Sequence, residues 1–478
     1  MFAIIAGALG SAFQHGYNTG VLNTPQSLLS QWINETITKR TGVPTSEGSI
    51  TTLWAITVAI FAAGGMIGGA SVGTIADRYG RKGGLLLINV LVVIAVIFEG
   101  FSKMAQSYEM LIIGRLFIGI NSGLNAGLAP MYLAEIAPVH LRGAVGTVYQ
   151  LIITISILIA QILSAENLLT TKNLWPLLLS LTIIPGIFQC FTLPLCPESP
   201  KYLLVSKGRD ADAKKALSWL RNTNDVHDEM EEMRQEYESS KIVPRVSMKD
   251  LVINPALRIP LIISVVVMIA QQFSGINAVM TFSTGIFTTA GMGKIGAGYA
   301  TMGVGAMNVV MTIVSLVLVE RCGRKTLLLF GFGGMAIDTA LLTICLTYAE
   351  NSTAAQYFSV ILVILFVVFF ATGPGSIPWF LVSELFNQSA RPVATSIAIA
   401  VNWGANFLVL MGYPPLEAAL KSNVFIIFVV FQVLFTLFIY RKVPETKNKT
   451  IEEISSMFRQ QTYQLLALFC SDANLIIE

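Results

Sequence analysis

Apolar segments long enough to cross a bilayer recur along almost all of the 478 residues. A helix needs roughly 20 mostly apolar residues to span the hydrocarbon core. Twelve segments meet that need, near residues 2–23, 52–75, 84–102, 108–132, 144–165, 174–195, 257–289, 299–319, 326–349, 356–382, 393–412 and 423–440. Only 12% of the residues are charged, whereas soluble domains carry about 25%. We therefore predict an all-α membrane protein with twelve transmembrane helices.

One long polar stretch, from about Lys201 to Leu251, divides the spans into two sets of six. It is rich in charge and repeats apolar residues at helical spacing, so we expect short amphipathic helices there. This stretch either simply connects the halves or latches them together. The predicted domains are an N-terminal six-helix bundle (1–196), a helical linker domain (197–254), a C-terminal six-helix bundle (255–442) and a tail (443–478).

Lysine and arginine concentrate in the connections on one side of the predicted bundle. Because cytoplasmic loops are enriched in these residues, both termini and the linker domain are expected in the cytoplasm. The plasma membrane is the expected location. The sequon that begins at Asn34 then lies outside the cell, where it is a candidate for glycosylation.

Three motifs occur twice, at equivalent helix ends of the two halves. Asp-Arg-Tyr-Gly-Arg-Lys at 77–82 recurs as Glu-Arg-Cys-Gly-Arg-Lys at 320–325, and Pro-Glu-Ser at 197–199 recurs as Pro-Glu-Thr at 444–446. Glu135 and Arg142 recur as Glu384 and Arg391. The repeat spacing is nearly constant, which indicates two homologous six-helix bundles. Parallel halves of this kind, with the substrate site between them, are typical of major facilitator transporters.

Charged residues in these motifs are candidates for gating. Acids accompany bases in every copy, so the groups can pair across the two halves when the cytoplasmic side is closed and separate when it opens. The alternative is that the basic residues only anchor the topology. The predicted gating residues are Arg81, Glu135, Arg142, Glu320, Arg324, Glu384 and Arg391.

Longer motifs extend over nearly the whole chain. They include Gly-Tyr-Asn-Thr-Gly-Val at 16–21, Gly-Arg at 114–115, Pro-Met-Tyr at 130–132, Gln-Gln-Phe-Ser-Gly-Ile-Asn-Ala at 271–278, Gly-Pro-Gly-Ser-Ile-Pro-Trp at 373–379 and Asn-Trp at 402–403. Together they resemble the facilitative glucose transporters of the sugar porter family. The resemblance implies a monomeric uniporter of hexoses, most readily D-glucose, that works by alternating access.

Amide side chains inside the spans form the candidate sugar site. Gln271, Gln272 and Asn277 lie together on one span, and amides both donate and accept hydrogen bonds, as an uncharged sugar requires. Buried polar groups in a membrane usually face a cavity, although interhelical hydrogen bonding is the alternative. The resemblance implies that sugar is held by Gln161, Gln271, Gln272, Asn277, Asn308, Trp379 and Asn402, with Trp403 lining the cavity.

The segment before Trp379 contains two glycines and two prolines within six residues, which excludes a regular helix. Broken helices at membrane depth are tolerated where they line cavities. We therefore expect Trp379 to stack on the sugar; an interfacial anchor is the alternative.

Two departures from the family pattern leave the preferred hexose open. Ala371 occupies the place of a glutamate, and Thr281 and Phe282 replace paired tyrosines. Both changes affect the expected affinity and the outer gate, so a carrier that prefers fructose or accepts many hexoses is an alternative. The retained Trp379 favours glucose.

Passive transport is the expected mode. Proton-coupled relatives carry an aspartate where this chain has Asn18, which cannot take up a proton at working pH. A proton symporter that uses His15 or Asp338 is the alternative, although we expect Asp338 to be protonated and hydrogen-bonded in a structural role. A third hypothesis is a sugar receptor, which usually needs a longer cytoplasmic tail.

Catalytic, cofactor and metal sites are not expected. The sequence shows no nucleophile–base pair and no nucleotide-binding loop. Its five cysteines have neither metal-ligand nor disulfide spacing. It also lacks the long basic runs of nucleic-acid binders. The expected partners are a small sugar and the lipid bilayer.

Overall fold

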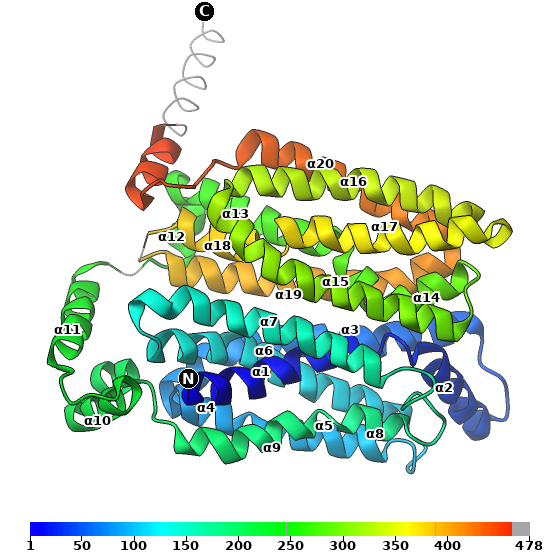
Figure 1. Cartoon of the computed structure of the whole chain (residues 1–478), viewed down its shortest axis with the longest axis horizontal. Coiled ribbons are helices and arrows are strands. Elements are labelled where there is room, and N and C mark those ends of the chain that lie inside the picture. Colours follow the sequence, from blue (N-terminus) through cyan, green and yellow to red (C-terminus); the bar gives the residue numbers. More distant parts are fainter. Residues whose placement is uncertain (245, 388, 461–478) are drawn as a thin grey trace, which may run out of the picture.

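The computed structural model describes residues 1–244, 246–387 and 389–460, and their regular structure is entirely helical (Figure 1). Ten segments of this described part are long and apolar enough to cross a membrane. One of the ten, Arg391–Lys442, comprises two helices, α19 (Arg391–Leu420) and α20 (Val424–Lys442). The less apolar helix α1 (Phe2–Gly20) completes the predicted twelve spans. Cys470 and the apolar run at 465–475 lie outside the described residues.

The N-terminal half contains six spans and an accessory helix, α2 (Gln26–Thr41), at one end (Figure 1). Two of the six spans are interrupted and therefore count as two helices each. The spans are α1, α3 (Glu47–Tyr79), α4 (Arg81–Leu87) with α5 (Asn89–Phe101), α6 (Tyr108–Ile136), α7 (Arg142–Leu163), and α8 (Trp175–Ser180) with α9 (Ile183–Thr192).

The C-terminal half repeats this arrangement beside the first (Figure 1). Its spans are α13 (Pro255–Phe273) with α14 (Ile276–Thr289), α15 (Lys294–Arg321), α16 (Arg324–Tyr348), α17 (Thr353–Thr372) with α18 (Ile377–Leu385), α19 and α20. Short 3-10 or π segments occur at Val139–Leu141, Leu193–Leu195, Tyr202–Ser206, Ala349–Asn351 and Lys421–Asn423.

The linker between the halves forms three short helices, α10 (Asp210–Arg221), α11 (His227–Ile242) and α12 (Met248–Ile253). Helices α10 and α11 lie at the end of the molecule opposite α2 (Figure 1). On α10, Ala213 and Leu217 face a small apolar core that also contains Met230 of α11. The two ends of the molecule are called the α2 end and the linker end below.

The halves meet through two helix pairs, α3 with α19 and α7 with α15. Small residues allow the first pair to approach closely. A Cβ atom on Gly65 of α3 would lie 2.5 Å from Cε3 of Trp403 on α19, closer than real side chains come. Glycine at position 65 is therefore required for the indole to pack between the halves.

Two helix breaks face each other in the C-terminal half. Span seven is interrupted between α13 and α14 at Gly275, whose φ of 93° lies in the left-handed region that favours glycine. Span ten is interrupted at 373–376, between α17 and α18, as its prolines and glycines predict. The backbone groups that these breaks release are available to side chains in the membrane interior.

Candidate functional site

Four amide side chains in the C-terminal half form one connected hydrogen-bond network. Nδ2 of Asn402 donates to Oε1 of Gln271 over 2.8 Å, and Nε2 of Gln272 donates to Oδ1 of Asn402 over 3.1 Å. Asn277 donates from Nδ2 to Oε1 of Gln272. The structure therefore brings together four of the residues that the sequence assigns to the sugar site, from α13, α14 and α19.

The network also binds the broken part of span ten. Nε2 of Gln271 lies 2.9 Å from the carbonyl oxygens of both Pro374 and Gly375. Such carbonyls are free because proline and the helix break remove their usual donors. One glutamine thus ties the two interrupted helices together, and any movement of α18 alters the amides around it.

Gln161 of α7 is fully buried, and neither its amide nitrogen nor its oxygen has a hydrogen-bond partner within the described structure. Its Oε1 lies against the backbone of α15, since a Cβ on Gly305 would come within 2.0 Å of it. Asn308, half-buried, follows three residues later on α15. A buried amide without a partner is costly, so Gln161 is suited to bind a polar ligand between the halves.

The two tryptophans differ in their surroundings. Trp403 is only 7% exposed, and its ring lies 6.0 Å from His15 of α1 and 6.3 Å from Phe61 of α3. Trp379 of α18 is 42% exposed. Trp403 therefore packs where the halves meet, whereas Trp379 is partly exposed.

The positions that depart from the family pattern are apolar or closely packed. Ala371 is 8% exposed near the end of α17, and Thr281 is 5% exposed in α14. Phe282 is 1% exposed, and its ring stacks on Tyr413 with 5.1 Å between centroids. The replaced tyrosine thus remains an aromatic packing residue, but position 371 offers no hydrogen bond to a hydroxyl.

Hydrogen bonds join the two halves at the α2 end. Nδ2 of Asn23 donates to the Met280 carbonyl and to Oγ of Ser283, both over 2.8 Å. The backbone amide of Thr284 donates to Oδ1 of Asn23 over 3.0 Å. Within the described residues, the side-chain hydrogen bonds between α1–α9 and α13–α20 occur only at this end. The α2 end is therefore the closed end.

At the linker end, the repeated motifs of the N-terminal half form a clamp. Arg81 and Glu135 form an ion pair with 3.0 Å between Nε and Oε2, and Ser199 donates its hydroxyl to Glu135. Glu198 accepts hydrogen bonds from the backbone amides of Arg81 (3.1 Å) and Lys82 (2.9 Å) at the first turn of α4. A carboxylate there complements the positive end of the helix dipole.

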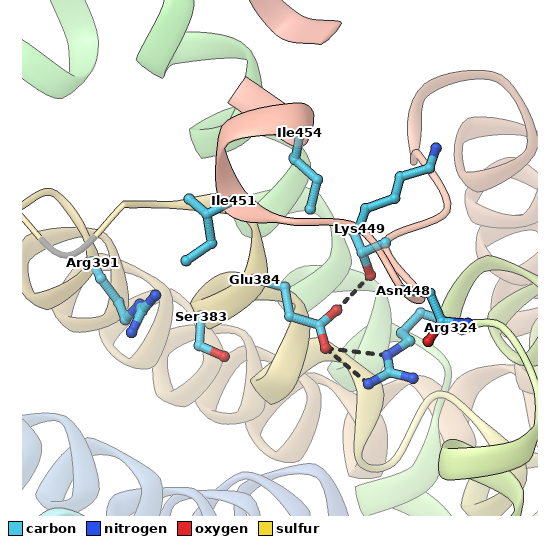
Figure 2. A pocket seen from close by; sticks show the side chains of 9 residues that line it. Arg324, Ser383, Glu384, Arg391, Asn448, Lys449, Ile451 and Ile454 are labelled. Carbon is cyan, nitrogen blue, oxygen red and sulfur yellow. Dashed lines mark hydrogen bonds and ion pairs between the residues drawn. The ribbon is translucent and has the colours of Figure 1, made fainter. Parts of the chain in front are cut away.

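The C-terminal half contains the same clamp (Figure 2). Arg324 and Glu384 lie 3.0 Å apart between Nη2 and Oε1, and Thr446 donates to Glu384. Glu445 accepts from the backbone amides of Arg324 (2.8 Å) and Lys325 (3.1 Å) at the start of α16. A cavity of about 380 Å³ lies beside this clamp, between α18 and residues 446–454.

The observed ion pairs of the repeated motifs lie within each half. Arg81 and Arg324 each pair within their own half, not across the halves. Arg142 and Glu320 are exposed, and Arg391, in the wall of the cavity in Figure 2, donates to the Phe386 carbonyl over 3.3 Å. Among the described residues no ion pair joins the two halves at the linker end, so the predicted pairing across the halves stays a prediction.

Glu198 and Glu445 belong to a repeated motif, but neither was predicted as a site residue. Each copy of that motif directly follows the last span of its half, and its carboxylate binds the start of the third span of the same half. What the sequence does not show is the contact between these distant helix ends.

Asp338 of α16 differs from its expected role. It is 3% exposed, and neither carboxylate oxygen has a hydrogen-bond partner among the described residues, so the expected hydrogen bond is wrong. Asn18 donates to Oγ1 of Thr182 and to the Gln14 carbonyl, each over 2.8 Å. A second buried carboxylate, Glu99 of α5, was missed; it is fully buried.

Metal-ligand clusters of three or more His, Cys, Asp or Glu residues are absent from the part of the chain that the structure describes. In the same part, Cys190, Cys196, Cys322 and Cys345 are unpaired thiols.

Comparison with known proteins gives consistent results. The family model described as "Sugar (and other) transporter" matches residues 3–458. Mouse solute carrier family 2, facilitated glucose transporter member 3 is 46% identical over 463 residues, which is 97% of this chain and 93% of the relative. The human member 3 is 45% identical with the same coverage, and chicken member 1 is 45% identical over 95% of this chain and 93% of that relative.

Solved structures agree with the sequence relatives. The xylose transporter XylE from E. coli in its inward open conformation has a TM-score of 0.78 at 26% identity, covering 95% of this chain and 98% of the transporter. Its partially occluded inward open conformation has a TM-score of 0.77, covering 93% and 99%.

Proposed function

Because this chain belongs to the sugar (and other) transporter family, we propose that it carries hexoses, chiefly D-glucose, across a membrane by facilitated diffusion. It is an integral membrane transporter with the twelve-helix major facilitator fold, and not an enzyme. The observation that carries the sugar assignment is the connected amide network of Gln271, Gln272, Asn277 and Asn402, built where two helices break.

When sugar binds, hydrogen bonds between the amides are replaced by hydrogen bonds to the sugar, and no charged group takes part. The amides that now bond to one another turn donors and acceptors toward the hydroxyls of a hexose, which need both. Gln161 supplies a free amide from the N-terminal half. The exposed ring of Trp379 offers an apolar face to the CH groups of the sugar. Contacts from both halves make the bound sugar sensitive to their relative position.

Alternating access follows from the asymmetry of the two ends. The hydrogen bonds of Asn23 hold the α2 end closed, while the charged groups at the linker end pair within their halves. When the linker end closes, Arg142 comes near Glu384 and Arg391 near Glu135. The clamps around Glu198 and Glu445 keep each half rigid during this movement. Lysine and arginine enrichment supports a cytoplasmic position of the linker end.

Uniport is supported by Asn18, which occupies the position of the proton-binding aspartate of symporters. Asn18 is hydrogen-bonded to Thr182 and to the α1 backbone, and an amide cannot carry a proton through the cycle. The substrate range is broader than in relatives with a glutamate at position 371. Ala371 forms no hydrogen bond that would select one orientation of a sugar hydroxyl. Fructose is therefore a second substrate to test.

The decisive experiment reconstitutes the purified protein in liposomes and measures competition for labelled D-glucose uptake by a panel of sugars. D-glucose should compete best, and an imposed pH gradient should not drive accumulation. Accumulation of sugar against its gradient would show symport. Absence of uptake for every monosaccharide would refute the proposed function.

Location and assembly belong to the same proposal. The protein acts as a monomer in the plasma membrane with both termini in the cytoplasm, and Asn34 on the external α2 carries a glycan. A shift in electrophoretic mobility after glycosidase treatment, lost in Asn34→Gln, tests the side on which α2 lies.

A further inference from the structure

Glu99 and Arg115 are a buried acid and base that the sugar site does not use. Glu99 lies two residues before the end of α5 and is 0% exposed, while Arg115 of α6 is 2% exposed. Gly114 makes room for the acid, because a Cβ there would lie 2.5 Å from Cγ of Glu99. Gly114 therefore lets the backbone of α6 lie against Glu99, and the next residue, Arg115, interacts with the carboxylate electrostatically.

Neither group is satisfied by hydrogen bonds. Both carboxylate oxygens of Glu99 and two nitrogens of Arg115, Nε and Nη1, have no partner among the described residues. Arg115 makes one hydrogen bond, from Nη2 to the Asn18 carbonyl over 3.2 Å, and lies over the Phe61 ring at 4.7 Å. The described residues show no ion pair between Glu99 and Arg115, and the two groups interact electrostatically over a longer distance.

Few other charged or titratable groups lie near Glu99. Tyr17 of α1 interacts with it electrostatically, and its hydroxyl donates to the Leu178 carbonyl. Helices α8 and α9 pack on α5 but carry no charged side chain. Lys103, just beyond α5, is bonded to Asn173 at 3.1 Å, and the basic residues Arg81 and Lys82 lie at the far end of α4.

We propose that Glu99 is a proton-binding site that controls the closed state of the α2 end, and this proposal rests on the proposed transport function. An arginine stays charged at every accessible pH, so Glu99 is the member of the pair that can change its charge. When Glu99 takes up a proton, Arg115 remains as an uncompensated buried charge, which destabilises the packing around it.

The affected packing leads to the gate. Arg115 holds the backbone of α1 at Asn18, and five residues later Asn23 makes the hydrogen bonds that close the α2 end. Protonation of Glu99 therefore loosens the part of α1 that carries the closing contact. The proton acts as a regulator of the conformational equilibrium and does not travel with the sugar.

The first test measures equilibrium exchange of labelled glucose in liposomes, with equal pH on both sides, from about pH 8 to about pH 5.5. The wild type should slow by about fivefold or more on acidification. Glu99→Gln, which mimics the protonated acid, should be slow and independent of pH, whereas Glu99→Asp should keep the pH dependence. The control Asp338→Asn removes another buried carboxylate and should retain the wild-type profile. An unchanged profile in Glu99→Gln would overturn the proposal.

A second readout does not need transport. Cysteines replace Thr24 and Thr284, whose hydroxyls lie 3.5 Å apart across the halves, in a background without native cysteines, and a short bifunctional thiol reagent joins them. The reference pair replaces Thr347 and Ser422, which contact each other within one half at 3.2 Å and correct for thiol chemistry. The corrected yield should fall on acidification and should be low at every pH with Glu99→Gln. A constant yield in the parent protein would overturn the proposal even if no sugar moved.

Discussion

At the scale of single residues, the proposed sugar site is a network of amides that carry no formal charge. Gln272 accepts a hydrogen bond from Asn277 and donates one to Asn402, so it occupies the middle of the amide network. Replacing it with an apolar residue leaves a donor and an acceptor unpaired, and it also removes the hydrogen bonds that Gln272 offers to the sugar. Its position makes it the most informative residue to replace.

Gln272→Ala should weaken glucose binding roughly 10- to 100-fold, the effect of losing one or two buried hydrogen bonds. The apparent affinity from concentration-dependent uptake measures this loss. Gln356→Ala provides the matched control, because Gln356 lies at the start of α17 and bonds to the Ala349 carbonyl at 3.1 Å. Equal affinities in wild type and Gln272→Ala would remove Gln272 from the site.

Ala371→Glu should raise glucose affinity by about tenfold, since one charge-assisted hydrogen bond to a hydroxyl contributes about 1.5–3 kcal/mol before the cost of burying the acid. Selectivity for glucose over fructose should rise with it. Competition uptake with both sugars measures the change, and Ala371→Leu, which adds volume without an acceptor, is the control. A gain in affinity with leucine would show that packing, not hydrogen bonding, matters at this position.

Individual site residues were predictable to different degrees. The four networked amides could be found because polar residues are rare within apolar spans, and their type matches the ligand. Glu99 was missed because it lies one turn from the end of an apolar segment, where a charged residue is expected to lie at the membrane surface. Only the packing of α6 against it, through Gly114, shows that it is buried.

At the scale of elements, two features organise the molecule: the helix breaks in spans seven and ten, and the carboxylates that bind the first backbone amides of α4 and α16. The break in span ten could be predicted because its prolines lack donors. The break at Gly275 could not be placed, since one glycine within an apolar span is compatible with a continuous helix. The clamps could not be predicted as such, because sequence shows charges but not which helix ends meet.

Glu445→Gln should lower the free energy of unfolding by about 1–3 kcal/mol, because the carboxylate accepts hydrogen bonds from two backbone amides at the positive end of α16. Glu198→Gln should do the same in the N-terminal half. Thermal unfolding in detergent measures both. Glu320→Gln, at the same end but exposed, should leave stability unchanged, and an equal loss there would argue against the clamps.

At the scale of the whole molecule, two six-helix halves meet through α3 with α19 and α7 with α15, and hydrogen bonds join them at the α2 end. The clamps join helix ends within each half, and the proposed alternating access requires the halves to move relative to each other along the contact of α3 with α19. Twelve spans in two repeats were predictable from hydropathy and the repeated motifs. The closed end was not, because both end states use the same sequence and differ only in which contacts form.

Covalent closure of the α2 end should stop transport while leaving sugar binding intact. With cysteines in place of Thr24 and Thr284, joined by the short bifunctional reagent, glucose exchange should fall to background because the α2 end can no longer open. Binding of sugar by detergent-solubilised protein should remain, since the open linker end still reaches the amide network.

Reduction of a cleavable reagent should restore exchange, which separates locking from damage. The pair at Thr347 and Ser422 should tolerate the same treatment with little effect on exchange, because those residues move together within the C-terminal half. If the locked protein still exchanged glucose, the α2 end would not be a gate, and the two halves would have to pass sugar without alternating between them.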